Sequence, residues 1–190
     1  MDHTTSTKPA RRRPSGGKSR QNKEGNNNKN NNNNQNNQNN QNKNNNNNQA
    51  RRQERIALNL DETLGVPLIQ NERITGFQMR DGAIELLNSL RKRYFLVLWS
   101  VGDRSYVNKL LSYGLRRYFR EIYTWEDFFD NWKDIRQIKV RYLIDDSDYH
   151  QQLAEREGFG QQYIVVPSFG SPEDLRDPQG WAKQIREALL

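Results

Sequence analysis

The chain of 190 residues contains no cysteine and only two histidines. Without cysteine, the protein has no disulfide framework, no cysteine-based zinc site and no cysteine nucleophile. Without a histidine near the motifs described below, a Ser-His-Asp hydrolase also has no support. The disulfide-stabilised secreted proteins and the thiol enzymes are therefore excluded as classes.

Long apolar runs are absent as well. Hydrophobic residues make up 33% of the chain, and they nowhere form the run of about 18 residues that a membrane span needs. The opening residues, MDHTTSTKPARRRPSGG, contain no apolar segment like that of a secretory signal. We therefore expect a soluble intracellular protein with no membrane partner, and the sequence does not separate the cytoplasm from the nucleus.

Asparagine and positive charge are in excess, and both are concentrated early in the chain. Residues 26–49 consist of 18 Asn, 4 Gln and 2 Lys, a composition that gains nothing by leaving water. Residues 1–55 hold 12 Lys and Arg against 3 Asp and Glu, whereas residues 56–190 hold 18 against 20. We therefore predict a disordered basic tail over residues 1–54 and one folded domain over residues 55–190.

The basic cluster of the tail lies within residues 8–23 and permits two interpretations. It could bind nucleic acid, an acidic protein surface or an import receptor. It could equally be a solvated segment that keeps the protein soluble, and the asparagine tract could self-associate through amide ladders. The spacing of the charges does not decide between these interpretations.

Short apolar runs alternate with amphipathic stretches along the folded part. The predicted strands are 56–60, 94–99, 120–123, 140–144 and 163–166, and the predicted helices are 81–90, 103–113, 147–157 and 181–190. This alternation predicts an α/β fold with a Rossmann-like, doubly wound parallel sheet covered by helices on both faces. Residues 64–79 contain Gly65, Pro67 and Gly76 and predict a loop with a small hairpin. We expect Asp81 to cap the helix that follows.

Polar residues follow three of the predicted strands. In parallel sheets the ligand crevice lies beyond the carboxyl ends of the strands. Clustered carboxylates repel one another unless a cation lies among them, and oxygen ligands suit Mg²⁺. A lysine and a hydroxyl beside the cation would hold phosphate oxygens. The residues that would form such a phosphoryl-transfer site are Asn59, Asp61, Ser100, Lys133, Asp145 and Asp146.

Each of these residues alone also has an ordinary structural interpretation. The pair Asp145-Asp146 could be a helix N-cap, Ser100 a turn residue and Lys133 a solvated side chain. Their occurrence together and in this order favours a site.

The same segments resemble a known superfamily. The order of LNLDETL, FLVLWSVGDRSYVNKLL, NWKDIRQI and YLIDDSD resembles the haloacid dehalogenase superfamily of aspartate-dependent phosphohydrolases. More narrowly, it resembles the branch with the RNA-polymerase C-terminal-domain phosphatases and the NLI-interacting-factor-like phosphatases. The resemblance covers about residues 55–167. It implies a haloacid dehalogenase-like fold with a small flap hairpin and no large cap, and a phosphorylated protein or small phosphomonoester as the substrate.

The resemblance also implies roles for the residues. Asn59 occupies the position of the covalent nucleophile, Asp61 that of the general acid and base, and Ser100 and Lys133 those of the phosphate-binding groups. The implied cofactor is Mg²⁺, and its ligands would be Asn59, Asp61 through its backbone carbonyl, Asp145 and Asp146.

The nucleophile position departs from the superfamily pattern, which has aspartate where this chain has Asn59. A neutral amide is a far poorer nucleophile than a carboxylate and removes one negative charge from the metal site. Two hypotheses follow. The chain is a Mg²⁺-dependent phosphatase weakened by a natural or engineered Asn59, or it is a pseudo-phosphatase that binds a phosphorylated partner or acts as a scaffold.

The remaining aromatic residues and the second histidine favour structural roles. We expect Trp99, Tyr118 and Phe119 in the core and His150 on the surface of a helix. A further aromatic group either packs over the sheet edge or lines a substrate groove: Trp125, Phe128, Phe129 and Trp132.

Overall fold

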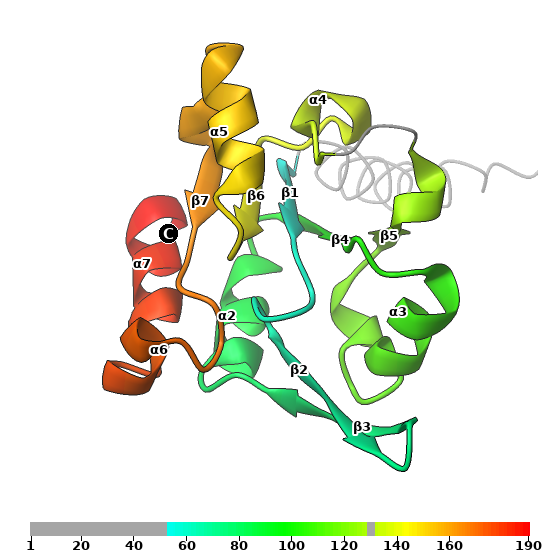
Figure 1. Ribbon diagram of the computed structural model, residues 1–190. Helices are drawn as coiled ribbons and strands as arrows, with labels where there is room; N and C mark the ends of the chain where they lie inside the picture. The colour runs from blue at the N-terminus through cyan, green and yellow to red at the C-terminus, as the bar shows by residue number, and fades with distance from the viewer. Residues whose placement is uncertain (1–52, 129–131) are drawn as a thin grey trace, which may run out of the picture. The chain divides into compact units, whose positions relative to one another are not determined.

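The computed structural model describes residues 53–128 and 132–190, so the predicted tail lies almost wholly outside the described residues. Its centre is a five-stranded sheet in the order β5-β4-β1-β6-β7, and every strand pairing is parallel (Figure 1). The strands are β1 (Arg55–Leu58), β4 (Phe95–Trp99), β5 (Glu121–Tyr123), β6 (Tyr142–Asp145) and β7 (Tyr163–Val165). The prediction of a doubly wound parallel sheet is confirmed.

Helices cover both faces of this sheet. They are α2 (Ala83–Leu90), α3 (Arg104–Leu111), α4 (Ile135–Ile138), α5 (Tyr149–Arg156), α6 (Pro172–Arg176) and α7 (Gly180–Leu189). The described residues also contain three short 3₁₀ turns, each between a helix and a strand: η1 (Arg116–Tyr118), η2 (Trp125–Asp127) and η3 (Gly160–Gln162). Because successive strand residues point to opposite faces, each strand contributes to two apolar clusters. Ile56 and Leu58 pack with α2, α3 and α7, whereas Ala57 packs with α4 and α5.

The two clusters explain why these strands contain almost continuous apolar runs. Leu96, Val97 and Leu98 of β4 are all at most 1% exposed, as expected for a strand covered on both faces. The predicted core positions of Trp99, Tyr118 and Phe119 are confirmed, since each side chain is at most 4% exposed. The sheet is therefore packed on both of its faces.

A separate antiparallel hairpin follows β1. It consists of β2 (Gly65–Gln70) and β3 (Arg73–Met79), and it confirms the predicted small hairpin. Asn71 and Glu72 form the two-residue turn with φ of 49° and 59°, the left-handed geometry that matches the twist of a hairpin. Gly65 is required at the first pair, because a Cβ there would lie 2.2 Å from the carbonyl oxygen of Gln78.

The expected N-cap role of Asp81 is wrong. The residue before helix α2 is Gly82, which has φ 78° and offers no side-chain cap. This left-handed residue turns the chain between Asp81 and the helix, and the backbone carbonyl of Asp81 instead accepts a hydrogen bond from Trp181 Nε1 at 2.9 Å. Helix α3 does have a side-chain N-cap, since Asp103 accepts a hydrogen bond from the Tyr106 backbone N–H at 2.8 Å.

Within residues 53–128 and 132–190, the structure contains no helix with the length and apolarity of a membrane span.

Candidate functional site

The predicted site residues meet at the carboxyl ends of the three central strands. Asn59 follows β1, Ser100 follows β4, and Asp145 ends β6, with β1 lying between the other two. Their backbones are tied to the neighbouring strands, since the N–H of Asn59 donates to the carbonyl of Ile144 at 2.8 Å. One chain of polar contacts connects all six predicted residues: Asn59, Asp61, Ser100, Lys133, Asp145 and Asp146.

The amide oxygen of Asn59 is held by a buried lysine. Lys133 Nζ donates to Asn59 Oδ1 at 2.8 Å and to Asp145 Oδ2 at 2.6 Å, and the lysine is 3% exposed. Burial of an ammonium group is costly unless it is paired and hydrogen-bonded, and both conditions are met here. Lys133 therefore belongs to the interior of the site, and its ordinary interpretation as a solvated side chain does not hold.

The amide nitrogen of Asn59 faces three oxygens. Nδ2 lies 2.8 Å from the backbone carbonyl of Asp61, 3.0 Å from Asp146 Oδ1 and 3.2 Å from Thr63 Oγ1. The Thr63 hydroxyl in turn donates to Asp146 Oδ1 at 2.6 Å and accepts from the Asp146 N–H at 3.2 Å. Thr63, which the sequence reasoning did not single out, is therefore a central member of the site.

These contacts fix the orientation of the Asn59 amide. Lys133 Nζ can only donate, whereas the carbonyl of Asp61 and the carboxylate of Asp146 can only accept. A flipped amide would place NH₂ against the ammonium group and oxygen against oxygen. The hydrogen-bond partners thus decide which end of the amide carries the nitrogen.

As arranged, these residues do not fit Mg²⁺. A magnesium ion requires oxygen ligands, whereas the N–H groups of Asn59 point at the carbonyl of Asp61 and at Asp146, two of the ligands that the resemblance assigns to the metal. In the described part of the chain, no group of three or more His, Cys, Asp or Glu side chains is arranged to hold a metal ion. The expected cofactor therefore remains without structural support.

Asp61 is surrounded by hydroxyl groups. The Tyr106 hydroxyl donates to Asp61 Oδ1, and Ser100 Oγ lies 3.4 Å from Asp61 Oδ2. Burial raises the pKa of Asp61, although these hydrogen bonds and the charge of Lys133 oppose the shift. Burial and the bond to Asp61 likewise raise the pKa of Tyr106. The position of Tyr106 in the first turn of the helix that follows Ser100 is the sequence signal that could have identified it.

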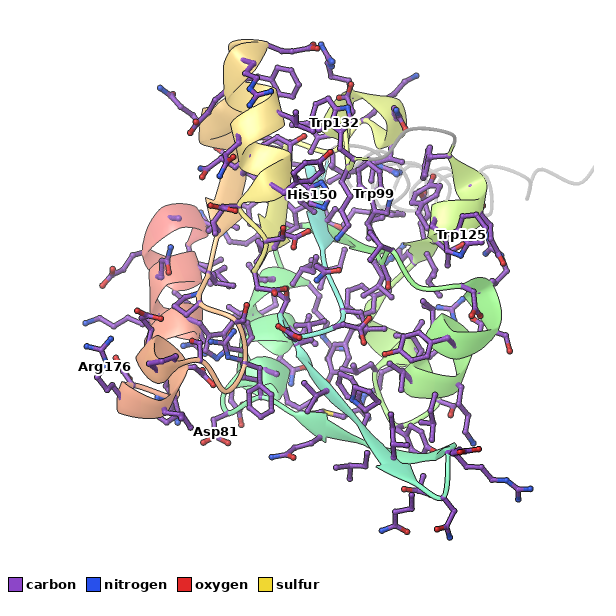
Figure 2. The ribbon with its side chains drawn as sticks, viewed as in Figure 1. Asp81, Trp99, Trp125, Trp132, His150 and Arg176 are labelled. Atoms are coloured by element: carbon purple, nitrogen blue, oxygen red, sulfur yellow. The ribbon has the colours of Figure 1, made fainter. Side chains whose placement is uncertain are left out.

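The expectation that His150 lies on the surface is wrong. Its side chain is 6% exposed and its Nδ1 accepts the backbone N–H of Lys133 at 3.2 Å (Figure 2). Burial, and then the charge of Lys133, lower the pKa of His150 to about 4. A neutral His150 therefore fixes the backbone of the residue that holds Asn59. Its inward direction follows from its place on the buried face of α5, four residues before the buried Ala154.

The C-terminal segment also reaches the site. Ser168 Oγ donates to Asp146 Oδ2 at 3.0 Å, and the N–H of Phe169 donates to the carbonyl of Glu62 at 2.8 Å. Both Asp146 oxygens are thus hydrogen-bonded. Sequence reasoning missed Ser168, because the residue lies beyond the last predicted strand and carries no motif.

The aromatic group splits between core and surface. Trp99 packs against Phe128 with ring centroids 5.2 Å apart, and Trp132 packs against Phe159 at 6.2 Å. Trp125 is instead 58% exposed (Figure 2), so packing over the sheet edge does not apply to it. Phe129 lies outside the described residues.

The fold is shared with solved structures of haloacid dehalogenase-like proteins. A Thermotoga maritima protein described as a candidate beta-phosphoglucomutase matches with a TM-score of 0.52 and 13% identity, over 72% of this chain and all (100%) of that chain. A haloacid dehalogenase-like hydrolase from Streptococcus pneumoniae matches with a TM-score of 0.50 and 13% identity, over 72% of this chain and 98% of that chain. At such identities the likeness shows the fold, so the narrower phosphatase branch stays a prediction.

Comparison with curated proteins gave no match. One protein-family model, by contrast, matches residues 21–151, which is more than half of the chain and includes the strands that carry Asn59, Ser100 and Asp145. The chain therefore belongs to the family described as protein of unknown function DUF705.

Proposed function

We propose that this chain is a phosphatase-like domain that does not hydrolyse phosphomonoesters with its present sequence, and that it acts as a binding or scaffold protein. The observation that carries the proposal is the amide of Asn59 at the end of β1. Its oxygen accepts the ammonium group of Lys133 at 2.8 Å, and a neutral amide oxygen in that state is a very poor nucleophile. An aspartyl-phosphate intermediate has no carboxylate to form on at this position.

The charges around the site also argue against tight capture of a phosphate group. Lys133 supplies one positive charge and is already paired with Asp145 at 2.6 Å, while Asp146 adds a second carboxylate beside Asn59. A phosphate dianion that entered would meet two carboxylates for one ammonium group. We therefore place partner recognition on the surface of the protein and not in this crevice.

The basic cluster within residues 8–23 is the proposed contact with such a partner. Its charge suits nucleic acid or an acidic protein surface, since the positive charge of the chain is concentrated in residues 1–55. Deletion of residues 1–50 should abolish salt-dependent RNA or DNA binding, because phosphate contacts give a steep salt dependence. Unchanged binding after the deletion would exclude this role.

Hydrolysis is the second candidate function, and the environment of Asp61 favours it. A general acid must hold a proton near neutral pH, and burial raises the pKa of Asp61 in that direction. On this view the amide of Asn59 slows turnover without abolishing it, and the unmodified chain retains a weak activity.

One assay separates the two functions. Turnover of p-nitrophenyl phosphate with Mg²⁺ should be undetectable for the unmodified chain and measurable for Asn59→Asp. The control is Asn108→Asp, which makes the same chemical change at an exposed position of α3. Turnover by the unmodified chain would refute the main proposal. Inactivity of both proteins would refute the assignment of a phosphatase site.

A further inference from the structure

We infer that the amide nitrogen of Asn59 replaces a divalent cation in this site, so that the site assembles without metal, and that a carboxylate at this position would make it a metal site. The inference deepens the proposed function and rests on its assignment of the site. It concerns the group that holds the oxygens of Asp61, Thr63 and Asp146 together. The effect of that group on stability can be measured without any substrate.

The first argument is the convergence of oxygens on one nitrogen. Three oxygen atoms lie 2.8 to 3.2 Å from Asn59 Nδ2, whereas an amide NH₂ group has only two hydrogens to share among them. Two of these oxygens, the carbonyl of Asp61 and Oδ1 of Asp146, only accept hydrogen bonds. They repel each other unless a positive group lies between them, and the amide hydrogens supply that partial charge.

The second argument is that Lys133 prevents the Asn59 amide from binding a cation while its oxygen accepts the ammonium group. To bind a cation, Asn59 would have to turn its oxygen toward Asp61 and Asp146, and its NH₂ would then face the ammonium group that is now 2.8 Å from Oδ1. A carboxylate has two acceptor oxygens, so one can accept from Lys133 while the other faces a cation. The amide and the cation are therefore alternatives in this site.

The third argument is that the surrounding groups keep the oxygens in place. Asp146 Oδ2 is held by Ser168 Oγ at 3.0 Å, and the Asp146 N–H is held by Thr63 at 3.2 Å. If Asn59 became a carboxylate, these anchors would hold Asp146 against a second negative charge. Such a cluster is destabilised without a cation and stabilised by one.

The test measures the melting temperature with MgCl₂ and with NaCl at matched ionic strength. The unmodified chain should melt at the same temperature in both. Asn59→Asp should melt several degrees lower without Mg²⁺ and should recover with a saturable dependence on Mg²⁺ concentration. Asn108→Asp is the control for the added charge, and it should not respond to Mg²⁺.

A double substitution, Asn59→Asp with Asp146→Asn, keeps the net charge of the unmodified chain and exchanges the amide with the carboxylate. It should regain much of the stability in the absence of Mg²⁺ and lose most of the Mg²⁺ response. If Asn59→Asp does not fold without cation, refolding with and without MgCl₂ replaces the melting curve, and recovery only with Mg²⁺ supports the inference.

Two outcomes would overturn the inference: a saturable Mg²⁺ response of the unmodified chain, or no response of Asn59→Asp. The result is independent of turnover. If Asn59→Asp binds Mg²⁺ but hydrolyses nothing, the inference stands and the assigned phosphatase chemistry fails. If it hydrolyses phosphate without any Mg²⁺ response, the inference alone fails.

Discussion

Arg80 and Asp174, 94 residues apart in the chain, form an ion pair whose side chains are 1% and 4% exposed. Two nitrogens of the guanidinium group donate to Asp174 Oδ1 at 2.8 and 2.6 Å, and the guanidinium group also stacks on Trp181 at 4.6 Å from the ring centroid. Asp174 Oδ2 accepts the N–H of Gly170 at 2.8 Å. The pair thus joins the end of β3 to the C-terminal segment that carries Ser168.

Breaking this pair from one side should destabilise the fold strongly. Asp174→Asn leaves a buried guanidinium group without its counter-ion, and we expect a loss of about 3–5 kcal/mol in the free energy of unfolding, measured by urea denaturation. The matched control is Glu173→Gln, which breaks the exposed pair with Arg176 and should change stability by less than about 0.5 kcal/mol. Equal effects at the two positions would contradict the role of burial.

Thr63→Val should cost about 1–3 kcal/mol in the free energy of unfolding. The substitution keeps the shape of the side chain but removes the hydroxyl that donates to Asp146 and accepts from Asn59. Thr75→Val is the control, since the hydroxyl of Thr75 makes one exposed bond, to the carbonyl of Leu68 at 3.2 Å. A neutral effect at Thr63 would mean that water satisfies these groups.

Tyr106→Phe should raise the pKa of Asp61 further. The tyrosine hydroxyl donates to Asp61 and favours the ionised carboxylate. Loss of the hydroxyl removes one interaction that lowers the pKa of Asp61 against the effect of burial. A carboxyl ¹³C NMR titration measures this directly. Tyr113→Phe removes a hydroxyl that bonds to the carbonyl of Ile74 at 3.3 Å and should leave Asp61 unchanged. A lower pKa of Asp61 in Tyr106→Phe would be inconsistent with the contact.

Acid should destabilise the protein partly through His150. Above about pH 6.5 the imidazole is neutral in both the folded and the unfolded chain. Between that pH and about 4, the pKa of the folded state, the unfolded chain binds a proton that the folded chain does not, so stability falls as the pH decreases. We expect this loss to reach about 2–3 kcal/mol.

His150→Asn should remove that part of the pH dependence, because the asparagine oxygen can still accept the backbone N–H of Lys133 but does not titrate in this range. The comparison requires urea denaturation of both proteins at several values of pH from 4 to 8. Parallel pH profiles of the two proteins would show that His150 titrates equally in the folded and unfolded chains.

The sheet could be predicted from the sequence because its strands are buried on both faces. Runs such as Phe95–Trp99 have no helical or strand periodicity of their own, and their length and spacing identified them. The helices α4 (Ile135–Ile138) and α6 (Pro172–Arg176) were not predicted, since four or five residues are too few to show a period. The start of α2 was misplaced because the left-handed Gly82 cannot be distinguished from an ordinary turn glycine.

The composition of the site could be predicted, but its internal contacts could not. Asn59, Ser100 and Asp145 follow from the rule that strand ends converge in a parallel sheet. Thr63, Tyr106 and Ser168 enter through hydrogen bonds whose partners are up to 83 residues away along the chain. The direction of the Asn59 amide depends on such contacts too, and a sequence pattern does not contain that information.

The short outer strands of the sheet have a consequence for self-association. β5 (Glu121–Tyr123) and β7 (Tyr163–Val165) have three residues each, so either edge exposes few unpaired backbone groups for a neighbouring molecule. The hairpin has longer free edges, and Leu68 and Ile69 of β2 are 46% and 62% exposed there. Edge-to-edge aggregation at high protein concentration would therefore start from the hairpin, and a lysine at Ile69 would oppose it.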